Sequence, residues 1–296
     1  MTGDASLDAF AAELGLPIPF PPLPLYRRIA AALALRARAK GGPIVVGLCG
    51  SQGSGKSTMA AFLARLLNED GLPTAILSLD DLYLDPEQRP VAIHPLFATR
   101  GVPGTHDVAL GMTTIDRLFA ACPGETVPIP RFDKARDRRY PESAWDPFVG
   151  PARIVLFEGW CVGVPPQPAE ALAVPINALE ADEDRDGRWR RHVNACLAGD
   201  YRALFGRIDR LVYLRAPDFD CVFAWRRRQE EKLRARVGGG AEGLMDEAAL
   251  RRFIQHYERL TRFALDTLPA RADIVVALDP AQGLSLERLS PAPETD

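Results

Sequence analysis

The chain has 296 residues, of which 47% are hydrophobic and 25% charged, a composition that fits a globular protein with a large core and one large domain or two small ones. Its formal net charge is −3. No overall positive field draws such a chain to nucleic acid or to an anionic membrane surface, and we expect neither as a partner.

Apolar runs and turn residues predict alternating helices and strands along the chain. Two helices, over 6–15 and 25–40, precede a continuous apolar run over 44–49, which is typical of a strand buried on both faces of a parallel sheet. The later strands are expected at 74–79, 153–157, 210–214 and 272–278, and the later helices at 57–70, 111–120, 188–205, 219–236 and 246–267. This alternation predicts an α/β fold with a doubly wound, mostly parallel sheet and helices on both faces.

A glycine-rich turn between the first strand and the next helix carries the strongest signal in the sequence. Residues 50–57 match the pattern G-x-x-x-x-G-K-[ST] in full. In such a P-loop the glycines let backbone N–H groups turn toward the phosphates of a nucleotide, the lysine reaches the β- and γ-phosphates, and the serine binds Mg²⁺. The predicted ATP-binding residues are Gly50, Ser51, Gln52, Gly53, Ser54, Gly55, Lys56, Ser57 and Thr58.

Three carboxylates follow predicted strands, and ligands of open α/β sheets bind at the carboxyl ends of their strands. Glu158 comes directly after an apolar run, the Walker B arrangement, and is predicted to hold Mg²⁺ together with Ser57. Asp80 ends the strand after the P-loop helix and is the candidate base for the hydroxyl of an acceptor. Asp81 could instead be a helix cap or turn residue.

The P-loop and the strand ending Ser78-Leu79-Asp80-Asp81-Leu82-Tyr83 resemble the uridine kinase, phosphoribulokinase and pantothenate kinase group. Four further segments are similar to its D-glycerate 3-kinase branch. They are His94–Leu96 with Arg100–Asp107 (R-G-V-P-G-T-H-D), Pro130–Lys134 (P-R-F-D-K), Leu156–Trp160, and Ala216–Phe219 with Val222–Arg226. The resemblance runs from about Val45 to about Asp279. It implies a P-loop kinase in which the first acid after the strand, Asp80, is the base.

The same resemblance implies an acceptor site in the two glycine- and proline-rich loops. The expected acceptor-binding residues are Tyr83, Arg100, His106, Asp107, Arg131, Asp133 and Lys134. Glycerate carries a carboxylate, which guanidinium groups bind in bidentate fashion, so Arg100 and Arg131 are the candidates to hold it. Arg100 could alternatively pair with Asp107 for structural reasons, and His106 could be a core histidine.

The helix expected at 219–236 is a candidate lid, because a kinase must exclude water from the phosphates. Arg226 shares the stripe of this helix that carries its aromatic residues, and an arginine there can neutralise charge that develops on the γ-phosphoryl group. We therefore group Arg226 with Asp80 and Lys56 as catalytic candidates, and expect a flexible loop over 237–243 to let the lid move. A charged surface helix with internal ion pairs is the alternative.

These observations predict one kinase domain over 44–288, a helical extension over 1–43 and a disordered tail over 289–296. Segments 180–187 and 238–240 are expected to be mobile loops. The predicted reaction is transfer of the γ-phosphoryl group of ATP–Mg²⁺ to the 3-hydroxyl of D-glycerate. The alternatives are a sibling kinase acting on a nucleoside, pantothenate or a sugar phosphate, and a non-catalytic protein in which ATP binding switches a partner.

The sequence also indicates a compartment. Its five cysteines are scattered without C-x-x-C spacing, which argues against a disulfide framework or a zinc site and for a reducing environment. The N-terminus lacks the basic region of a signal peptide, and no apolar run reaches the ~18 residues of a membrane span. We expect a cytoplasmic enzyme, and the sequence predicts no oligomeric state.

Overall fold

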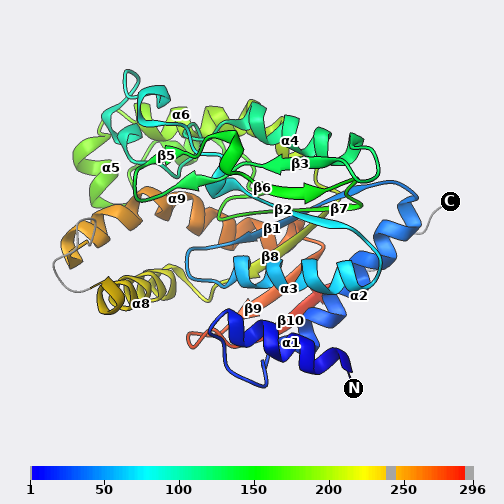
Figure 1. The fold of residues 1–296 in the computed structure, drawn as a ribbon. Coiled ribbons are helices and arrows are strands. Elements are labelled where there is room, and N and C mark those ends of the chain that lie inside the picture. The colour runs from blue at the N-terminus through cyan, green and yellow to red at the C-terminus, as the bar shows by residue number, and fades with distance from the viewer. Residues whose placement is uncertain (1, 238–244, 291–296) are drawn as a thin grey trace.

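The computed structural model describes residues 2–237 and 245–290, and its central element is a six-stranded sheet (Figure 1). The strands are β1 (Ile44–Gly50), β2 (Thr74–Ser78), β3 (Thr126–Ile129), β4 (Phe132–Asp133), β5 (Arg138–Arg139), β6 (Asp146–Val149), β7 (Ile154–Gly159), β8 (Arg210–Arg215), β9 (Ile274–Leu278) and β10 (Leu284–Leu289). The helices are α1 (Thr2–Glu13), α2 (Leu23–Lys40), α3 (Lys56–Glu69), α4 (Val108–Ala120), α5 (Ala178–Glu183), α6 (Arg188–Ala198), α7 (Asp200–Phe205), α8 (Phe219–Val237) and α9 (Glu247–Arg271).

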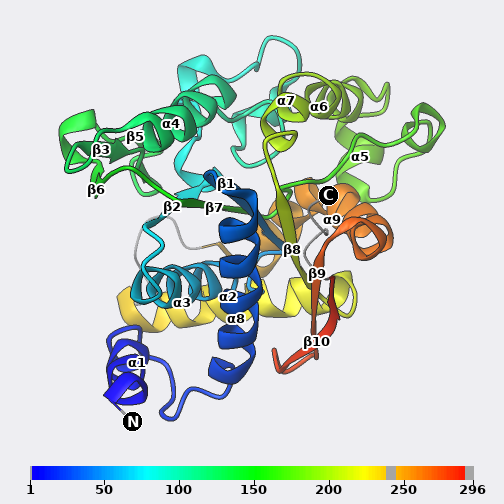
Figure 2. The ribbon, with the colours of Figure 1, turned by 90° about the vertical axis from the view of Figure 1, so that its right-hand side faces the viewer.

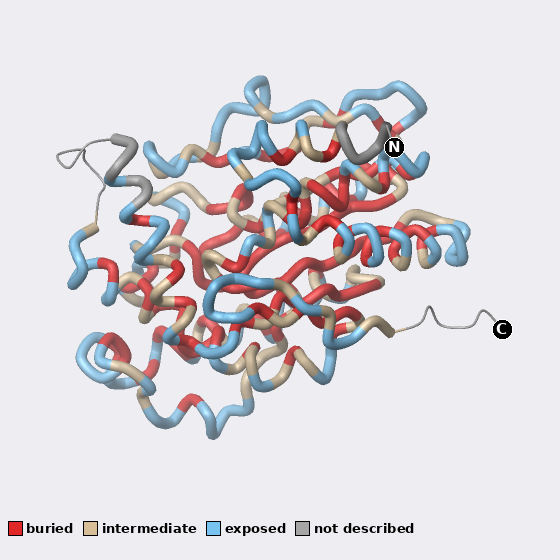
Figure 3. The backbone as a smooth tube through the Cα atoms, turned by 90° about the horizontal axis from the view of Figure 1, so that it is seen from below, coloured by how far each residue is buried: buried red, intermediate tan, exposed pale blue. Residues whose placement is uncertain are grey.

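The sheet has the strand order β10-β9-β8-β1-β7-β2, and its pairs are parallel except for β10 against β9. Every residue of β1 and β7 is buried, as the continuous apolar runs predict. Figure 3 shows that buried backbone runs through the middle of the molecule. Because β1, β7 and β2 are adjacent and parallel, their carboxyl ends lie next to one another at the same edge of the sheet. The predicted doubly wound α/β fold is confirmed.

Helices cover both faces of the sheet, each with its own apolar core (Figures 1 and 2). One core joins the sheet to α4, α6, α7 and α9, and the other joins it to α1, α2, α3 and α8. Helices α1 and α2 pack on α3 through aromatic side chains: the ring of Phe62 in α3 lies 5.0 Å from that of Phe10 in α1 and 5.8 Å from that of Tyr26 in α2. Phe20, in the connector between the two helices, stacks on the same ring at 4.6 Å. The amino-terminal helices therefore share the core behind the P-loop helix.

Three of the segments expected from the sequence differ in the structure. The expected mobile loop at 180–187 is wrong, because it begins as α5 and contains Glu180 and Asp184, whose side chains are fully buried in ion pairs with Arg259 and Arg190. The single helix expected at 188–205 is broken at Gly199 into α6 and α7. The tail is expected to start at Leu289, but this residue is the last one of β10.

The loops expected at 237–243 and 238–240 lie outside the described residues, except for Val237 at the end of α8, and so do residues 291–296. Within 2–237 and 245–290, none of the helices is both long enough and apolar enough to span a bilayer.

Candidate active site

The P-loop connects the end of β1 to the start of α3. Gly53 and Gly55 adopt left-handed backbone angles, with φ of +79° and +84°, and a β-carbon on Gly53 would approach Cβ of Trp225 to 2.7 Å. Glycine is thus required for both conformation and space. The hydroxyl groups of Ser51 and Ser54 are buried without a hydrogen-bond partner, as polar atoms of a loop built for a ligand can be.

Glu158 lies beside the P-loop because β7 is the direct neighbour of both β1 and β2. In register it faces Leu48 of β1 and Ser78 of β2. Its Oε1 accepts hydrogen bonds from Ser57 Oγ and Ser78 Oγ, each 3.0 Å long, while Oε2 is buried with no partner. A carboxylate with a free oxygen next to the P-loop serine fits the oxygen ligands that Mg²⁺ prefers.

Asp80 lies in a short 3₁₀ turn, η1 (Leu79–Asp81), directly after β2. One carboxylate oxygen accepts a 2.7 Å hydrogen bond from Tyr83 Oη and the other a 3.0 Å bond from Lys134 Nζ. Burial raises the pKa of Asp80, but the charges of Lys134 and Lys56 and these two hydrogen bonds outweigh it and hold the pKa below its usual range. The carboxylate is therefore ionised and able to accept a proton at neutral pH.

A cavity of about 550 Å³ joins the P-loop to this acid. Among the predicted nucleotide and metal residues Gln52, Gly53, Lys56 and Ser57 line it, and among the predicted catalytic and acceptor residues Asp80, Tyr83, Arg100, Lys134 and Arg226 do. It is also lined by Arg89, Ala98, Thr99, Asp137, Gln229, Phe253 and Tyr257. Donor loop, candidate base and several cationic groups thus share one cavity.

The R-G-V-P-G-T-H-D segment forms a hydrogen-bonded loop that presents Arg100 to the cavity. Trp160 Nε1 donates a 2.8 Å hydrogen bond to the carbonyl of Gly101, and Tyr257 Oη donates a 2.9 Å bond to that of Arg100. Gly101 has φ of +124°, and a β-carbon there would lie 2.2 Å from Tyr257 Oη. The guanidinium of Arg100 lies over the rings of Tyr83 and Phe132, at 5.8 and 5.6 Å.

His106 and Asp107, at the end of the same segment, do not line the cavity. His106 is buried, stacks on Tyr83 and shares a 2.6 Å hydrogen bond between Nδ1 and Tyr201 Oη. Burial lowers the pKa of His106 to about 3 against the opposing charge of Asp80, so the ring is neutral. Asp107 caps α4 through the backbone N–H of Leu110 and pairs with Arg139 rather than with Arg100.

The P-R-F-D-K segment leads into the hairpin of β4 and β5. As in the previous segment, only some of its predicted acceptor-binding residues line the cavity. Lys134 lines the cavity, whereas Arg131 lies outside and pairs with Asp81 and Asp146, at 2.8 and 3.1 Å. Asp133 accepts hydrogen bonds from two backbone N–H groups within its own turn. Asp81 also accepts the backbone N–H of Phe132, so this acid positions the hairpin.

Helix α8 contributes Arg226 and Gln229 to the cavity wall. Arg226 pairs with Glu230 one turn later, at 3.0 Å, and lies over the ring of Phe253 of α9, at 5.8 Å. The internal pairing that the sequence offered as an alternative is therefore present, and the same arginine also faces the cavity.

Sequence reasoning missed Arg89 and Asp137. Arg89 lines the cavity although its side chain is only 2% exposed, and it binds Asp137 through two hydrogen bonds, of 2.8 and 2.6 Å. The two residues are 48 positions apart and belong to no motif. Only the folding of the β4–β5 hairpin over this loop brings them together.

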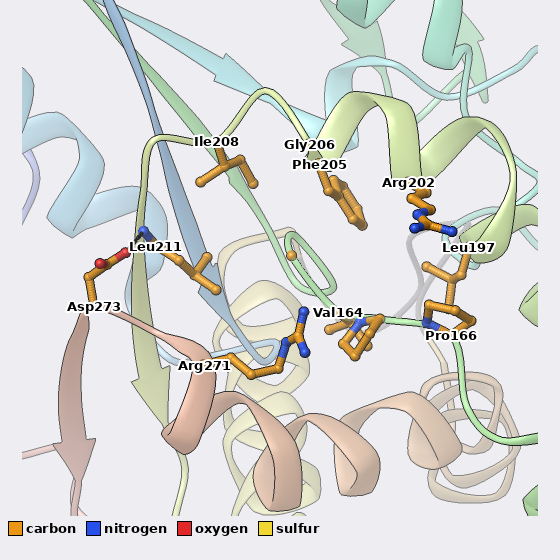
Figure 4. Close-up of a pocket in the computed structure, with 12 residues that line it drawn as sticks. Val164, Pro166, Leu197, Arg202, Phe205, Gly206, Ile208, Leu211, Arg271 and Asp273 are labelled. Carbon is orange, nitrogen blue, oxygen red and sulfur yellow. Dashed lines mark hydrogen bonds between the residues drawn. The ribbon is translucent and has the colours of Figure 1, made fainter. Parts of the chain in front are cut away.

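A second cavity, of about 680 Å³, lies away from the P-loop at the amino ends of β8 and β9 (Figure 4). Its wall combines apolar side chains, among them Val164, Leu197 and Leu211, with charged ones, and Arg271 points into it. The described residues that line it include none of the predicted site residues.

Comparisons with known proteins place the chain among kinases. No family model matches the chain. The chain is 35% identical over 253 residues to a Schizosaccharomyces pombe protein named uncharacterized kinase mug58, covering 80% of this chain and 86% of that protein. It is 30% identical over 253 residues to the chloroplastic D-glycerate 3-kinase of Arabidopsis thaliana, again over 80% of this chain. It belongs to the D-glycerate 3-kinase family of P-loop kinases.

The match to the Arabidopsis protein spans about half of that protein, 52% of its length. A solved structure of D-glycerate 3-kinase from Cryptococcus neoformans matches with a TM-score of 0.71 and 22% identity, covering 90% of this chain and 99% of that one. At that identity the match shows the fold alone. The family assignment makes this member an ATP-dependent phosphotransferase.

Proposed function

We propose that this family member phosphorylates the 3-hydroxyl of D-glycerate, giving 3-phosphoglycerate and ADP. The observation that carries the proposal is the single cavity that holds the P-loop lysine, the ionised Asp80 and the guanidinium of Arg100. The name of the plant relative supports the same acceptor. The acceptor carries a carboxylate at one end and the reacting hydroxyl at the other, which matches a cavity with a cationic wall and a base.

On the donor side, Lys56 and the backbone N–H groups of residues 50–58 bind the triphosphate. Ser57 and Glu158 are the residues that hold Mg²⁺, since the Glu158 carboxylate has a buried free oxygen beside the serine hydroxyl. The ion neutralises charge on the phosphates and keeps them in place. Arg226, on the wall formed by α8, adds positive charge near the transferred group.

On the acceptor side, Asp80 orients the 3-hydroxyl and takes its proton as the oxygen attacks the γ-phosphorus. The new O–P bond forms as the bond from the γ-phosphorus to the β,γ-bridging oxygen breaks, and ADP leaves with that oxygen. Tyr83 holds the Asp80 carboxylate through its hydroxyl. Arg100 binds the acceptor carboxylate in this scheme. Arg131 lies outside the cavity and is left out of it.

A coupled ADP-release assay with ATP–Mg²⁺ tests the proposal on the purified full chain. D-Glycerate is compared with L-glycerate, glycerol, uridine, pantothenate and ribulose 5-phosphate. Turnover that requires D-glycerate supports the proposed acceptor, and failure with glycerol shows that the carboxylate is needed. Turnover with another acceptor on the panel and none with D-glycerate contradicts the proposed acceptor. Tight ATP binding without turnover of any acceptor would instead fit a protein in which ATP switches a partner.

A further inference from the structure

The acceptor end of the cavity already contains a carboxylate that belongs to the protein. Asp137, in the turn of the β4–β5 hairpin, binds both arginines of the cavity wall: Arg89 donates two hydrogen bonds to its two oxygens, and Arg100 donates a further short one. Its side chain is 33% exposed. An acidic small molecule would bind such a wall through the same contact, a carboxylate hydrogen-bonded to two guanidinium groups.

Arg89 is fixed by the rest of the protein, independently of the hairpin. Its Nε donates to the carbonyl of Leu84, at 3.1 Å, and its Nη1 donates to that of Ala98, at 2.9 Å. The two terminal nitrogens remain directed at Asp137. Because the side chain is almost fully buried, its charge is costly to leave without an anion. A carboxylate at this position therefore stabilises the folded protein.

The segment that supplies the carboxylate is the exposed tip of a two-stranded hairpin. Asp137 adopts a left-handed backbone with φ of +55°, which is uncommon for a residue other than glycine. From the same tip Lys134 donates to the carboxylate of Asp80. The tip thus contacts the two groups that an acidic alcohol needs, the anion-binding arginines through Asp137 and the base through Lys134.

We infer that Asp137 occupies the place of the acceptor's carboxylate in the free enzyme, and that the acceptor displaces it to bind the Arg89–Arg100 pair. This inference rests on the proposed function, because it names the residues of that site that select an acidic acceptor. It adds Arg89 to the acceptor site and makes the hairpin tip an internal competitor of the substrate. Asp137 has the opposite effect on binding from a residue that merely orients the arginines.

The test uses Asp137→Asn, which removes the charge and keeps the size of the side chain. Without the internal competitor, the KM for D-glycerate falls roughly tenfold, which corresponds to about 1.4 kcal/mol, while kcat changes less than about threefold. A structural role predicts the reverse, since loosened arginines raise KM. An unchanged or raised KM overturns the inference.

Glu87→Gln is the matched control. Glu87 pairs with Arg138 of the same hairpin, and neither residue lines the cavity. The control therefore removes one negative charge and one hairpin contact without touching Arg89 or Arg100, and its KM stays at the wild-type value. A similar fall of KM in this control would assign the effect to hairpin mobility and overturn the role of the Asp137 carboxylate.

Asp137→Gly provides a second variant in case Asp137→Asn folds poorly. It removes the carboxylate and suits the left-handed backbone, and its KM must also fall.

A binding measurement that needs no turnover distinguishes failure of this inference from failure of the proposed function. D-Lactate has the carboxylate but no 3-hydroxyl, and isothermal titration calorimetry in the presence of ADP and Mg²⁺ gives its affinity. Tighter binding of D-lactate to Asp137→Asn than to wild type supports the inference. Equal or weaker binding to the variant, or no binding to either protein, overturns it, whether or not D-glycerate is turned over.

Discussion

Replacing Asp80 by Asn tests the base directly, because the change removes the proton acceptor and almost nothing else. The carboxylate makes two side-chain contacts, with Tyr83 Oη at 2.7 Å and Lys134 Nζ at 3.0 Å. An amide can keep both if its oxygen faces the ammonium group and its NH₂ faces the tyrosine hydroxyl, which then reverses to accept. We therefore expect a folded protein whose melting temperature is lower by no more than a few degrees, the equivalent of about 1 kcal/mol.

The catalytic loss should be much larger. General-base catalysis typically contributes about 10²–10⁴ in rate, so we expect kcat of Asp80→Asn to fall by about that factor. The KM for ATP stays within about twofold, because the P-loop is untouched. Single-turnover measurements with saturating ATP and D-glycerate isolate the chemical step, and binding of a fluorescent ATP analogue checks the donor site separately.

Asp81→Asn is the control for this experiment. This neighbouring acid holds Arg131 and the backbone of Phe132 and does not line the cavity. Its loss should raise the acceptor KM through the hairpin while lowering kcat less than about tenfold. If Asp80→Asn kept most of its turnover, or if Asp81→Asn lost as much as Asp80→Asn, the assignment of Asp80 as the base would be wrong.

Three further outcomes follow from the same contacts. Arg100→Gln should raise the KM for D-glycerate about 10–100-fold with the KM for ATP unchanged, as steady-state kinetics with each substrate varied will show. Glu158→Gln should raise the Mg²⁺ concentration that gives half-maximal rate by about tenfold or more, measured by Mg²⁺ titration at fixed ATP. Burial raises the pKa of Asp80, but Lys134 and Lys56 outweigh it and depress the pKa. The Asp80 carboxylate thus stays ionised down to acid pH, and it is protonated only below the usual pKa range of an aspartate. A plot of kcat/KM for the acceptor against pH should therefore show no acidic limb between about pH 5.5 and 8, whereas a limb near pH 6 would mean that a different group is the base.

Local signals sufficed for the fold and for the donor loop. The P-loop is a contiguous segment, and β1 and β7 are continuous apolar runs, so composition over a few residues predicts a buried parallel strand followed by a phosphate-binding turn. The error at α5 arises because local composition is the only guide. A segment rich in acidic residues is typical of a solvated loop. Glu180 is nevertheless fully buried, because Arg259, 79 positions further on, donates to both of its carboxylate oxygens.

The acceptor end of the cavity depends on contacts between distant segments, and these leave no mark in a single sequence. Arg89 precedes a proline in a stretch without a motif, and its partner Asp137 is 48 positions away. Tyr257 reaches the backbone of Arg100 across 157 positions. In contrast Arg131 stands in a motif of the family, and its contacts are with Asp81 and Asp146 outside the cavity.

The R-G-V-P-G-T-H-D motif therefore identifies the family better than it identifies the substrate. In R-G-V-P-G-T-H-D, Arg100 lines the cavity, while Gly101 admits Tyr257, His106 packs in the core and Asp107 caps α4. A relative that keeps the glycine, histidine and aspartate keeps the scaffold, whatever acceptor it binds. A buried charge that a ligand leaves unpaired discriminates between ligands far more than an apolar contact does, so the choice of acceptor depends on the charged groups around Arg100. In this protein these groups include Arg89 and Asp137 at the tip of the β4–β5 hairpin.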